Sequence, residues 1–124
     1  ADRERLTQLL AILLDNALSY TPAGGKILLL LTQTKSQTVF AVADNGPSIP
    51  DEEKVRIFER FYRADNSHTD HGHFGLGLCT AQEIAKAHHG KLTVCDLADS
   101  PFLPDRFFGD TGVVFVFCCP KKGL

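Results

Sequence analysis

Residues 13–22 read Leu-Leu-Asp-Asn-Ala-Leu-Ser-Tyr-Thr-Pro, and they decide how the chain folds. They end a segment in which leucine or alanine recurs every three or four residues, a spacing that predicts an amphipathic helix over residues 3–20. Asparagine is a poor helix former, so Asn16 needs a reason; its amide oxygen is a hard neutral ligand that suits Mg²⁺. Tyr20 lies one turn later on the same face, where its ring can lie against a base or sugar. Helix-end hydrogen bonding and core packing are the alternative explanations for each residue alone.

The rest of the chain alternates between short apolar runs and turn-forming residues. Lys35 and Ser36 are typical of a hairpin connection, and Gly90 is expected to cap the last helix. The order of elements predicts an α+β domain, a two-layer sandwich whose mixed, mostly antiparallel sheet carries helices on one face. We predict strands at residues 26–32, 38–43, 92–95 and 113–119, and further helices at residues 51–60 and 76–89.

Composition limits the classes of protein that fit. A length of 124 residues indicates one domain, residues 1–124. Thirteen Lys and Arg against fifteen Asp and Glu leave a net charge of -2, which excludes a strongly basic nucleic-acid binder. No apolar run approaches the ~20 residues that a membrane span needs. Cys79, Cys95, Cys118 and Cys119 form no CxxC pair, so we expect buried reduced thiols and a cytoplasmic compartment, with a zinc site or disulfides as the alternative.

Two glycine-containing segments could hold a ligand. Residues 44–49 read Asp-Asn-Gly-Pro-Ser-Ile, in which Asp44 can accept a hydrogen bond from an exocyclic amine and Gly46 lets the backbone approach a flat ring. A simple Asp-Gly turn explains the same residues. Residues 75–78 read Gly-Leu-Gly-Leu at the start of a helix, where free amides and the helix dipole attract anions. A flexible loop that enters a helix is the alternative.

A fourth segment, residues 57–63, reads Ile-Phe-Glu-Arg-Phe-Tyr-Arg. Its aromatic side chains can anchor the segment, while Arg60 and Arg63 can meet phosphate oxygens with two hydrogen bonds each. A solvated amphipathic helix is the alternative. The four segments occur in one order in one small domain, and that combination is far more specific than any one of them.

In this combination the sequence resembles the catalytic and ATP-binding domain of bacterial sensor histidine kinases, which has the Bergerat ATP-binding fold shared with gyrase and mismatch-repair ATPases. The resemblance covers nearly the whole chain. Residues 13–22 resemble the N box, residues 44–49 the first glycine box, residues 58–63 the F box and residues 75–78 the second glycine box. Residues 112–120 are similar to the closing strand of the family.

The resemblance implies ATP and Mg²⁺ as cofactors and a role for each matching residue. Asn16 would coordinate Mg²⁺ on the triphosphate, Asp44 would receive the adenine amine and Tyr20 would pack on the nucleotide. Tyr62 and Arg63 would sense the terminal phosphate, and residues 64–74 would form the ATP lid. The implied catalytic residues are Asn16, Tyr62 and Arg63, and the implied cofactor-binding residues are Asn16, Tyr20, Asp44, Gly46, Ile49, Phe58, Arg63, Gly75, Leu76, Gly77 and Leu78.

The resemblance also implies a reaction and its partners. The chain would be a protein histidine kinase of a two-component system, transferring the γ-phosphoryl of ATP to a histidine for relay to a response regulator receiver domain. None of the five histidines lies in a family-like acceptor context, so the acceptor would be on a separate helical hairpin of the same protein. We therefore expect an excised cytoplasmic domain of a membrane-anchored kinase, without its dimerisation, acceptor and sensor parts, that is monomeric alone.

Four positions depart from the family pattern. Ile12 stands where kinases usually have Asn and the related ATPases have a Glu base, and an apolar side chain cannot activate water. Ser19 replaces a frequent basic residue, Ser48 replaces a glycine and His73 stands where a lid glycine is common. The alternatives to a kinase are therefore a degenerate nucleotide-binding regulatory module without kinase activity and, disfavoured by Ile12, an ATP-hydrolysing switch of the gyrase type.

Two further segments have open interpretations. Residues 68–73 contain three histidines and Asp70, which can bind zinc or nickel or be the polar residues of a loop. Residues 96–110 contain Phe102, Phe107 and Phe108 and are long for a connection between strands. Local packing and a docking surface for another domain are the two explanations for these phenylalanines.

Overall fold

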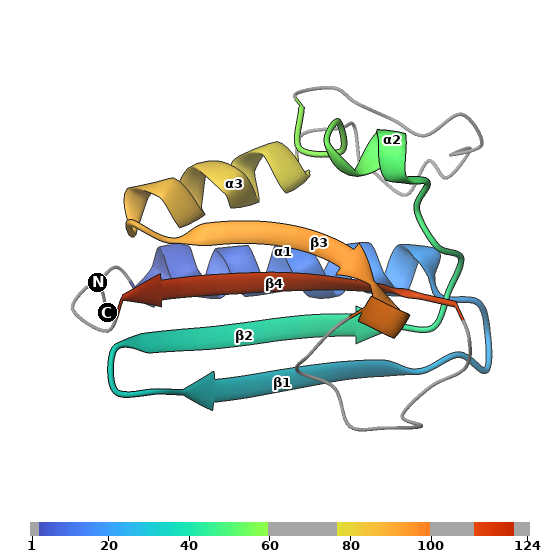
Figure 1. The fold of residues 1–124 in the computed structure, drawn as a ribbon, viewed down its shortest axis with the longest axis horizontal. Coiled ribbons are helices and arrows are strands. Elements are labelled where there is room, and N and C mark those ends of the chain that lie inside the picture. Colours follow the sequence, from blue (N-terminus) through green and yellow to red (C-terminus); the bar gives the residue numbers. More distant parts are fainter. Residues whose placement is uncertain (1–2, 60–76, 100–110, 121–124) are drawn as a thin grey trace.

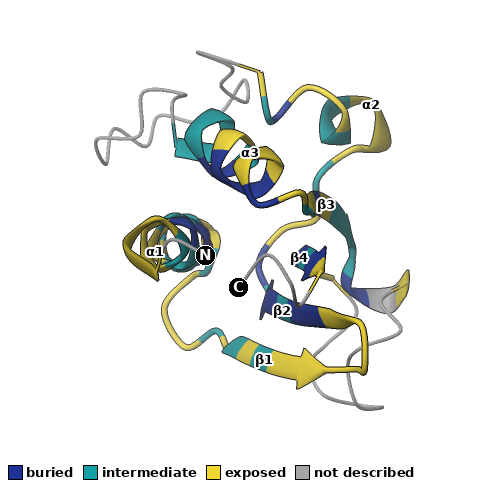
Figure 2. Ribbon diagram, turned by 90° about the vertical axis from the view of Figure 1, so that its left-hand side faces the viewer, coloured by how far each residue is buried: buried dark blue, intermediate teal, exposed yellow. Residues whose placement is uncertain are grey.

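The computed structural model describes residues 3–59, 77–99 and 111–120 of the chain (Figure 1). In these ranges a four-stranded sheet forms one layer, and the two longer helices cover one of its faces (Figures 1 and 2). This is the two-layer α+β architecture expected from the order of elements. The elements are α1 (Arg3–Tyr20), β1 (Ile27–Gln33), β2 (Gln37–Asp44), α2 (Asp51–Lys54), α3 (Gly77–Ala87), β3 (Lys91–Asp96), the 3₁₀ turn η1 (Leu97–Asp99) and β4 (Val113–Pro120).

The strands lie in the order β1-β2-β4-β3, so β2 and β4 are central and β1 and β3 are the edges. All three pairings are antiparallel, and no parallel pair occurs among the described strands. The predicted hairpin at Lys35 and Ser36 is confirmed, because the Thr34 N–H donates to the Gln37 carbonyl at 2.8 Å. The sequence therefore predicted every strand end to within one residue.

Both faces of the central strands are apolar and buried (Figure 2). The main core lies between the sheet and α1 and α3, and its largest buried rings are Phe115 and Phe117 of β4. A second, smaller cluster occupies the opposite face and contains Val114 and Val116. Burial on both faces explains why β4 reads as a continuous apolar run instead of an alternating one.

The predicted helix over residues 51–60 is wrong in its length, because α2 contains only the four residues Asp51–Lys54. The backbone then tightens into turns: the Arg56 N–H donates to Glu53 and the Glu59 N–H donates to Arg56, both across three residues. These turns bring Ile57 into the main core, where it is 8% exposed. Core packing therefore overrides the helical preference of this segment, and Arg60 lies outside the described residues.

The end of α3 also differs from the prediction that Gly90 is its cap. His89 has the left-handed conformation, with φ of 59°, and Gly90 is the residue after it. The Gly90 N–H donates to Ala85 at 2.8 Å and the His89 N–H donates to Lys86 at 3.0 Å, which together form a Schellman motif. A Cβ on Gly90 would lie 2.5 Å from the Cys118 carbonyl oxygen, so glycine is required there for close approach to β4.

The four cysteines are all free, as predicted, but only Cys119 is fully buried. Burial raises the pKa of the Cys95, Cys118 and Cys119 thiols, which makes them poor nucleophiles at neutral pH. The described ranges contain no cluster of three or more His, Cys, Asp or Glu side chains suited to a metal ion. None of the described helices is both long and apolar enough to cross a bilayer.

Candidate functional site

Asp44 is the centre of the candidate site. It is the last residue of β2, and only 3% of its surface is exposed. Burial raises the pKa of its carboxyl group, while a hydrogen bond from the Gly46 N–H to Oδ1, at 2.9 Å, acts in the opposite direction. The turn after β2 therefore holds a desolvated carboxylate in a fixed orientation, as recognition of a hydrogen-bond donor requires.

Gly46 brings the end of α1 against this carboxylate. A Cβ on Gly46 would collide with the carbonyl oxygen of Tyr20 and would lie 3.1 Å from Asp44 Oδ1. The sequence suggested that this glycine makes room for a flat ring, whereas the structure gives a contact between protein main chains as the requirement. Tyr20, Asp44 and Gly46, which the resemblance assigns to one nucleotide site, therefore lie side by side.

Asn45 binds the connection between α1 and β1 to the turn after β2. Its Oδ1 accepts a hydrogen bond from the Lys26 N–H at 2.8 Å, and its own N–H donates to the Lys26 carbonyl at 3.2 Å. Gly25 packs so closely that an added Cβ would lie 2.9 Å from Asn45 Oδ1. These contacts fix the chain on both sides of Tyr20 and Asp44.

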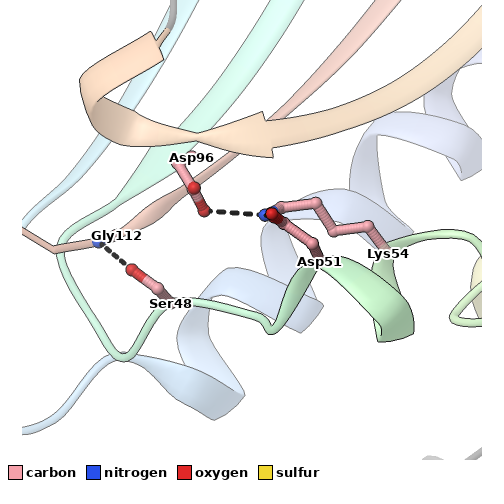
Figure 3. Close-up of polar contacts among 5 residues, drawn as sticks. All are labelled: Ser48, Asp51, Lys54, Asp96 and Gly112. Carbon is pink, nitrogen blue, oxygen red and sulfur yellow. Dashed lines mark hydrogen bonds and ion pairs between the residues drawn. The ribbon is translucent and has the colours of Figure 1, made fainter.

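Gly112 is a residue of the site that the sequence analysis did not single out. Its φ of 148° lies in the region that favours glycine, and a Cβ there would collide with the Asp44 carbonyl oxygen. Its N–H donates to Ser48 Oγ at 3.3 Å (Figure 3), and its carbonyl accepts from the Leu97 N–H at 3.0 Å. The position of Gly112 directly before the apolar residues 113–119 is the sequence feature that could have pointed to it. Ser48, a departure from the family pattern, thus accepts a hydrogen bond that a glycine could not.

The helical residues of the site lie on α1 and at the start of α3, which pack against each other. Asn16 is half-buried on α1, one turn before Tyr20, and Tyr20 is 41% exposed. Ile12 contacts the first turn of α3, since a Cβ on Gly77 would lie 3.6 Å from its Cγ2. That is an ordinary contact, so the described packing does not itself require glycine at position 77.

Three predicted site residues take part in the main core. Ile49, Phe58 and Leu78 are half-buried and pack against it. The Phe58 ring lies edge-on to Phe115, with 6.2 Å between ring centroids, so this side chain anchors its segment to β4. A direct contact of any of the three with a nucleotide stays a prediction. The other predicted site residues, Tyr62, Arg63, Gly75 and Leu76, lie outside the described residues, as do residues 64–74 with the histidines at 68–73.

Known proteins match this chain over most of its length. The sequence model of the family described as "Histidine kinase-, DNA gyrase B-, and HSP90-like ATPase" matches residues 1–123. The adaptive-response sensory kinase SasA of Nostoc sp. is 43% identical over 95 residues, which are 76% of this chain and 23% of that protein. The sensor protein CiaH of Streptococcus pneumoniae is 45% identical over 96 residues, 77% of this chain and 22% of that protein. The chain thus spans about a quarter of the length of these curated relatives.

Solved structures agree with the fold. A mycobacterial sensor histidine kinase, MprB, superimposes with a TM-score of 0.80 at 30% identity over 97% of this chain and 74% of that chain. Full-length ShkA in complex with AMPPNP gives 0.75 at 30% identity, over 97% of this chain and 22% of that one. Histidine kinase ThkA in complex with the response regulator protein TrrA gives 0.71 at 30% identity, over 99% of this chain and 30% of that one. The buried carboxylate after β2, the helix end beside it and these matches together show that the chain belongs to the family of histidine kinase-, DNA gyrase B- and HSP90-like ATPases, as a domain of the sensor histidine kinase type.

Proposed function

We propose that this domain binds ATP between the end of α1, the end of β2 and the start of α3, and that it transfers the γ-phosphoryl group to a histidine. The observation that carries the proposal is the buried Asp44 carboxylate, oriented by Gly46 and placed beside Tyr20. An ionised carboxylate can only accept hydrogen bonds, so it selects a donor such as the exocyclic amine of adenine. The complex of ShkA with AMPPNP, an ATP analogue, supports the choice of nucleotide.

The phosphate end of the nucleotide would lie toward α3. Gly77 begins this helix, and the N–H groups of a first helical turn have no partner within the helix. These groups and the helix dipole would hold the triphosphate, and Gly77 leaves room for it because no side chain stands there. Leu78 packs against the main core and so holds the start of α3 on the sheet.

Asn16 is the residue that would hold Mg²⁺. Its amide oxygen is a hard, neutral donor on the half-buried face of α1, which suits a cation that keeps phosphate oxygens and water as its other ligands. When bound, Mg²⁺ neutralises charge on the phosphates during transfer. Tyr62 and Arg63 are proposed to act at the terminal phosphate on the strength of the F-box resemblance.

In the proposed reaction a ring nitrogen of the acceptor histidine attacks the γ-phosphorus. A nitrogen–phosphorus bond forms, the bond to the bridging oxygen breaks and ADP leaves. Positioning and charge neutralisation supply most of the catalysis in such transfers. Ile12 lies against the first turn of α3 and cannot remove a proton from water, so we expect slow hydrolysis of ATP without an acceptor.

The chain spans about a quarter of the length of its curated relatives, so the acceptor and the response regulator are proposed as partners outside it. We propose that the acceptor histidine lies on a dimerisation hairpin elsewhere in the same protein. The complex of ThkA with TrrA supports a response regulator as the next partner in the relay. Residues 1–124 alone are proposed to be monomeric, and the parent kinase to be membrane-anchored with this domain on the cytoplasmic side.

Calorimetry with an ATP analogue and Mg²⁺ tests the site, and labelled ATP with a supplied acceptor hairpin tests the transfer. Asp44→Asn is the sharpest variant, since the amide keeps an oxygen acceptor for the Gly46 N–H but presents a donor where the amine would bind. Asp99→Asn in η1 is the matched control. We expect strong loss of affinity in the first and none in the second. Equal affinity in both would overturn the adenine site, and binding without labelling of the hairpin would favour the regulatory module.

A further inference from the structure

Lys54 joins α2 to the end of β3. Its Nζ lies 2.5 Å from Asp51 Oδ1 on its own helix and 3.0 Å from Asp96 Oδ1, the last residue of β3 (Figure 3). The Lys54 side chain is 15% exposed and that of Asp96 is 35% exposed, whereas Asp51 is 91% exposed. The pair with Asp96 is therefore the sheltered one, and the pair with Asp51 is an ordinary surface contact within one helix.

Asp96 depends on this lysine. Its Oδ1 is buried, and no hydrogen-bond donor is aligned with it among the residues that the structure describes. The Lys54 ammonium is thus the group that compensates this oxygen, while the rest of the Asp96 side chain is partly exposed to solvent. The two aspartates raise the pKa of Lys54, Asp51 more than Asp96, so the ammonium is charged at neutral pH.

Asp96, the partner of Lys54, lies on the same row of the sheet as Asp44. Asp96 pairs with Val113 across β3 and β4, and Val113 pairs with Asp44 across β4 and β2. Directly paired residues have their side chains on one face, and Val113 belongs to the main core under α1 and α3, so both aspartates lie on the helix face, two strands or about 10 Å apart. Residues 45–54 thus leave the sheet at Asp44 and return to it at Asp96.

Polar contacts hold this loop at its start, middle and end, besides the Asn45–Lys26 hydrogen bonds and the packing of Ile49 on the core. The Asp44–Gly46 hydrogen bond lies at its start, the Gly112–Ser48 hydrogen bond at its middle and the Lys54–Asp96 pair at its end. In each of the first two, a main-chain N–H donates to a side-chain oxygen, at 2.9 and 3.3 Å. The pair at the end joins the loop to β3, and α2 has no side-chain hydrogen bond at its N-cap residue, Pro50.

We propose that Lys54 is a positioning residue of the nucleotide site, which closes residues 45–54 onto the Asp44 row by its ion pair with Asp96. The inference rests on the proposed ATP site at Asp44. In the closed loop, Gly46 keeps its contact with Tyr20 and its hydrogen bond to Asp44. Without the pair the loop keeps its contacts at Asp44 and Ser48 but loses its ion pair with β3, and on this proposal the carboxylate then loses the orientation in which it receives the amine.

The test separates positioning from simple stabilisation. Lys54→Met keeps the aliphatic stem but loses the charge, whereas the double variant Lys54→Met/Asp96→Asn also removes the unpaired carboxylate. Lys54→Arg keeps a cation of similar reach, and Lys35→Met in the exposed hairpin turn is the matched control. Affinity for an ATP analogue is measured by calorimetry well below the unfolding temperature, and hydrogen exchange is followed at the amides of residues 53–59.

We expect Lys54→Met and the double variant to bind about 5- to 10-fold more weakly, with faster exchange in residues 53–59. The double variant should regain unfolding temperature but not affinity, while Lys54→Arg and Lys35→Met should bind within about twofold of the wild type. Affinity that returns together with stability in the double variant would reduce Lys54 to a structural residue and overturn the inference. If Lys54→Met does not fold, the double variant gives the answer. Absence of binding in the wild type would instead overturn the proposed function, and this inference with it.

Discussion

The carbonyl oxygen of Tyr20 occupies the space in which a side chain on Gly46 would begin. The end of α1 therefore packs directly against the turn after β2. The same glycine orients the Asp44 carboxylate through its N–H group. The close approach links packing directly to the candidate site, because a change at Gly46 must move either the helix end or the carboxylate.

Gly46→Ala should therefore damage both stability and binding. The obstructing atom belongs to the main chain and cannot rotate away, so we expect a loss of about 1–3 kcal/mol in the free energy of unfolding. Urea denaturation measures this loss, and calorimetry should show weaker binding of an ATP analogue. Wild-type stability in this variant would mean that Tyr20 and Gly46 do not pack as described.

Gly77→Ala should affect binding alone. An added methyl group would make only an ordinary contact with Ile12, and alanine is the better helix former, so the free energy of unfolding should be unchanged or higher by up to about 1 kcal/mol. The same methyl group would stand at the helix start proposed to hold phosphate, and we expect a loss of affinity of about tenfold. Unchanged affinity for the ATP analogue would contradict the proposal that the phosphates bind at the start of α3.

Gly112→Ala should be among the most destabilising changes in the described part of the chain. It combines a φ of 148° with a collision against the Asp44 carbonyl, and we expect a loss of about 3 kcal/mol or more. Gly24→Ala is the matched control, because Gly24 also has a positive φ, 84°, but has no atom within 4 Å of an added Cβ. It should lose only about 1 kcal/mol. Equal losses in chemical denaturation would show that the contact with Asp44 carries no energy.

The pH dependence of binding should follow Asp44. Burial raises its pKa above the ordinary value of 3.8, so the carboxylate needed for the adenine amine is lost on acidification at a higher pH than for an exposed aspartate. The free energy of unfolding depends on pH in the opposite direction. It falls as the pH rises through the raised pKa of Asp44, and it stays lower at neutral pH. Asp44→Asn should thus be at least as stable as the wild type at pH 7 while it binds weakly.

Titration of affinity and of unfolding midpoint against pH checks both statements. The wild type should lose affinity as the pH falls through the raised pKa, and Asp44→Asn should show no such step. Asp99→Asn should retain the wild-type profile. A wild-type profile in Asp44→Asn would assign the titration to another group.

The local pattern of side chains was sufficient to predict much of this fold. The periodic leucines of α1 predicted its limits, Arg3–Tyr20, without error, and the hairpin at Lys35 and Ser36 followed from turn chemistry. Such elements depend on interactions between residues close in sequence. The main chain of Tyr20 lies against Gly46 beside Asp44, and the shared role of these residues in a nucleotide site stays a prediction.

The remainder depended on partners far along the chain. Ser48 and Gly112 are 64 residues apart, and nothing in either neighbourhood indicates that they meet. The helix after Pro50 stops early because Ile57 and Phe58 pack on the sheet, and Lys54 pairs with Asp96 at the end of β3, far along the chain. Sequence alone thus determined the periodic elements and the chemical groups available to the site, because these arise from local spacing and residue type. Only the tertiary structure decided why Gly46 and Gly112 must be glycine and what closes residues 45–54, because those requirements come from atoms that the folded sheet brings into contact.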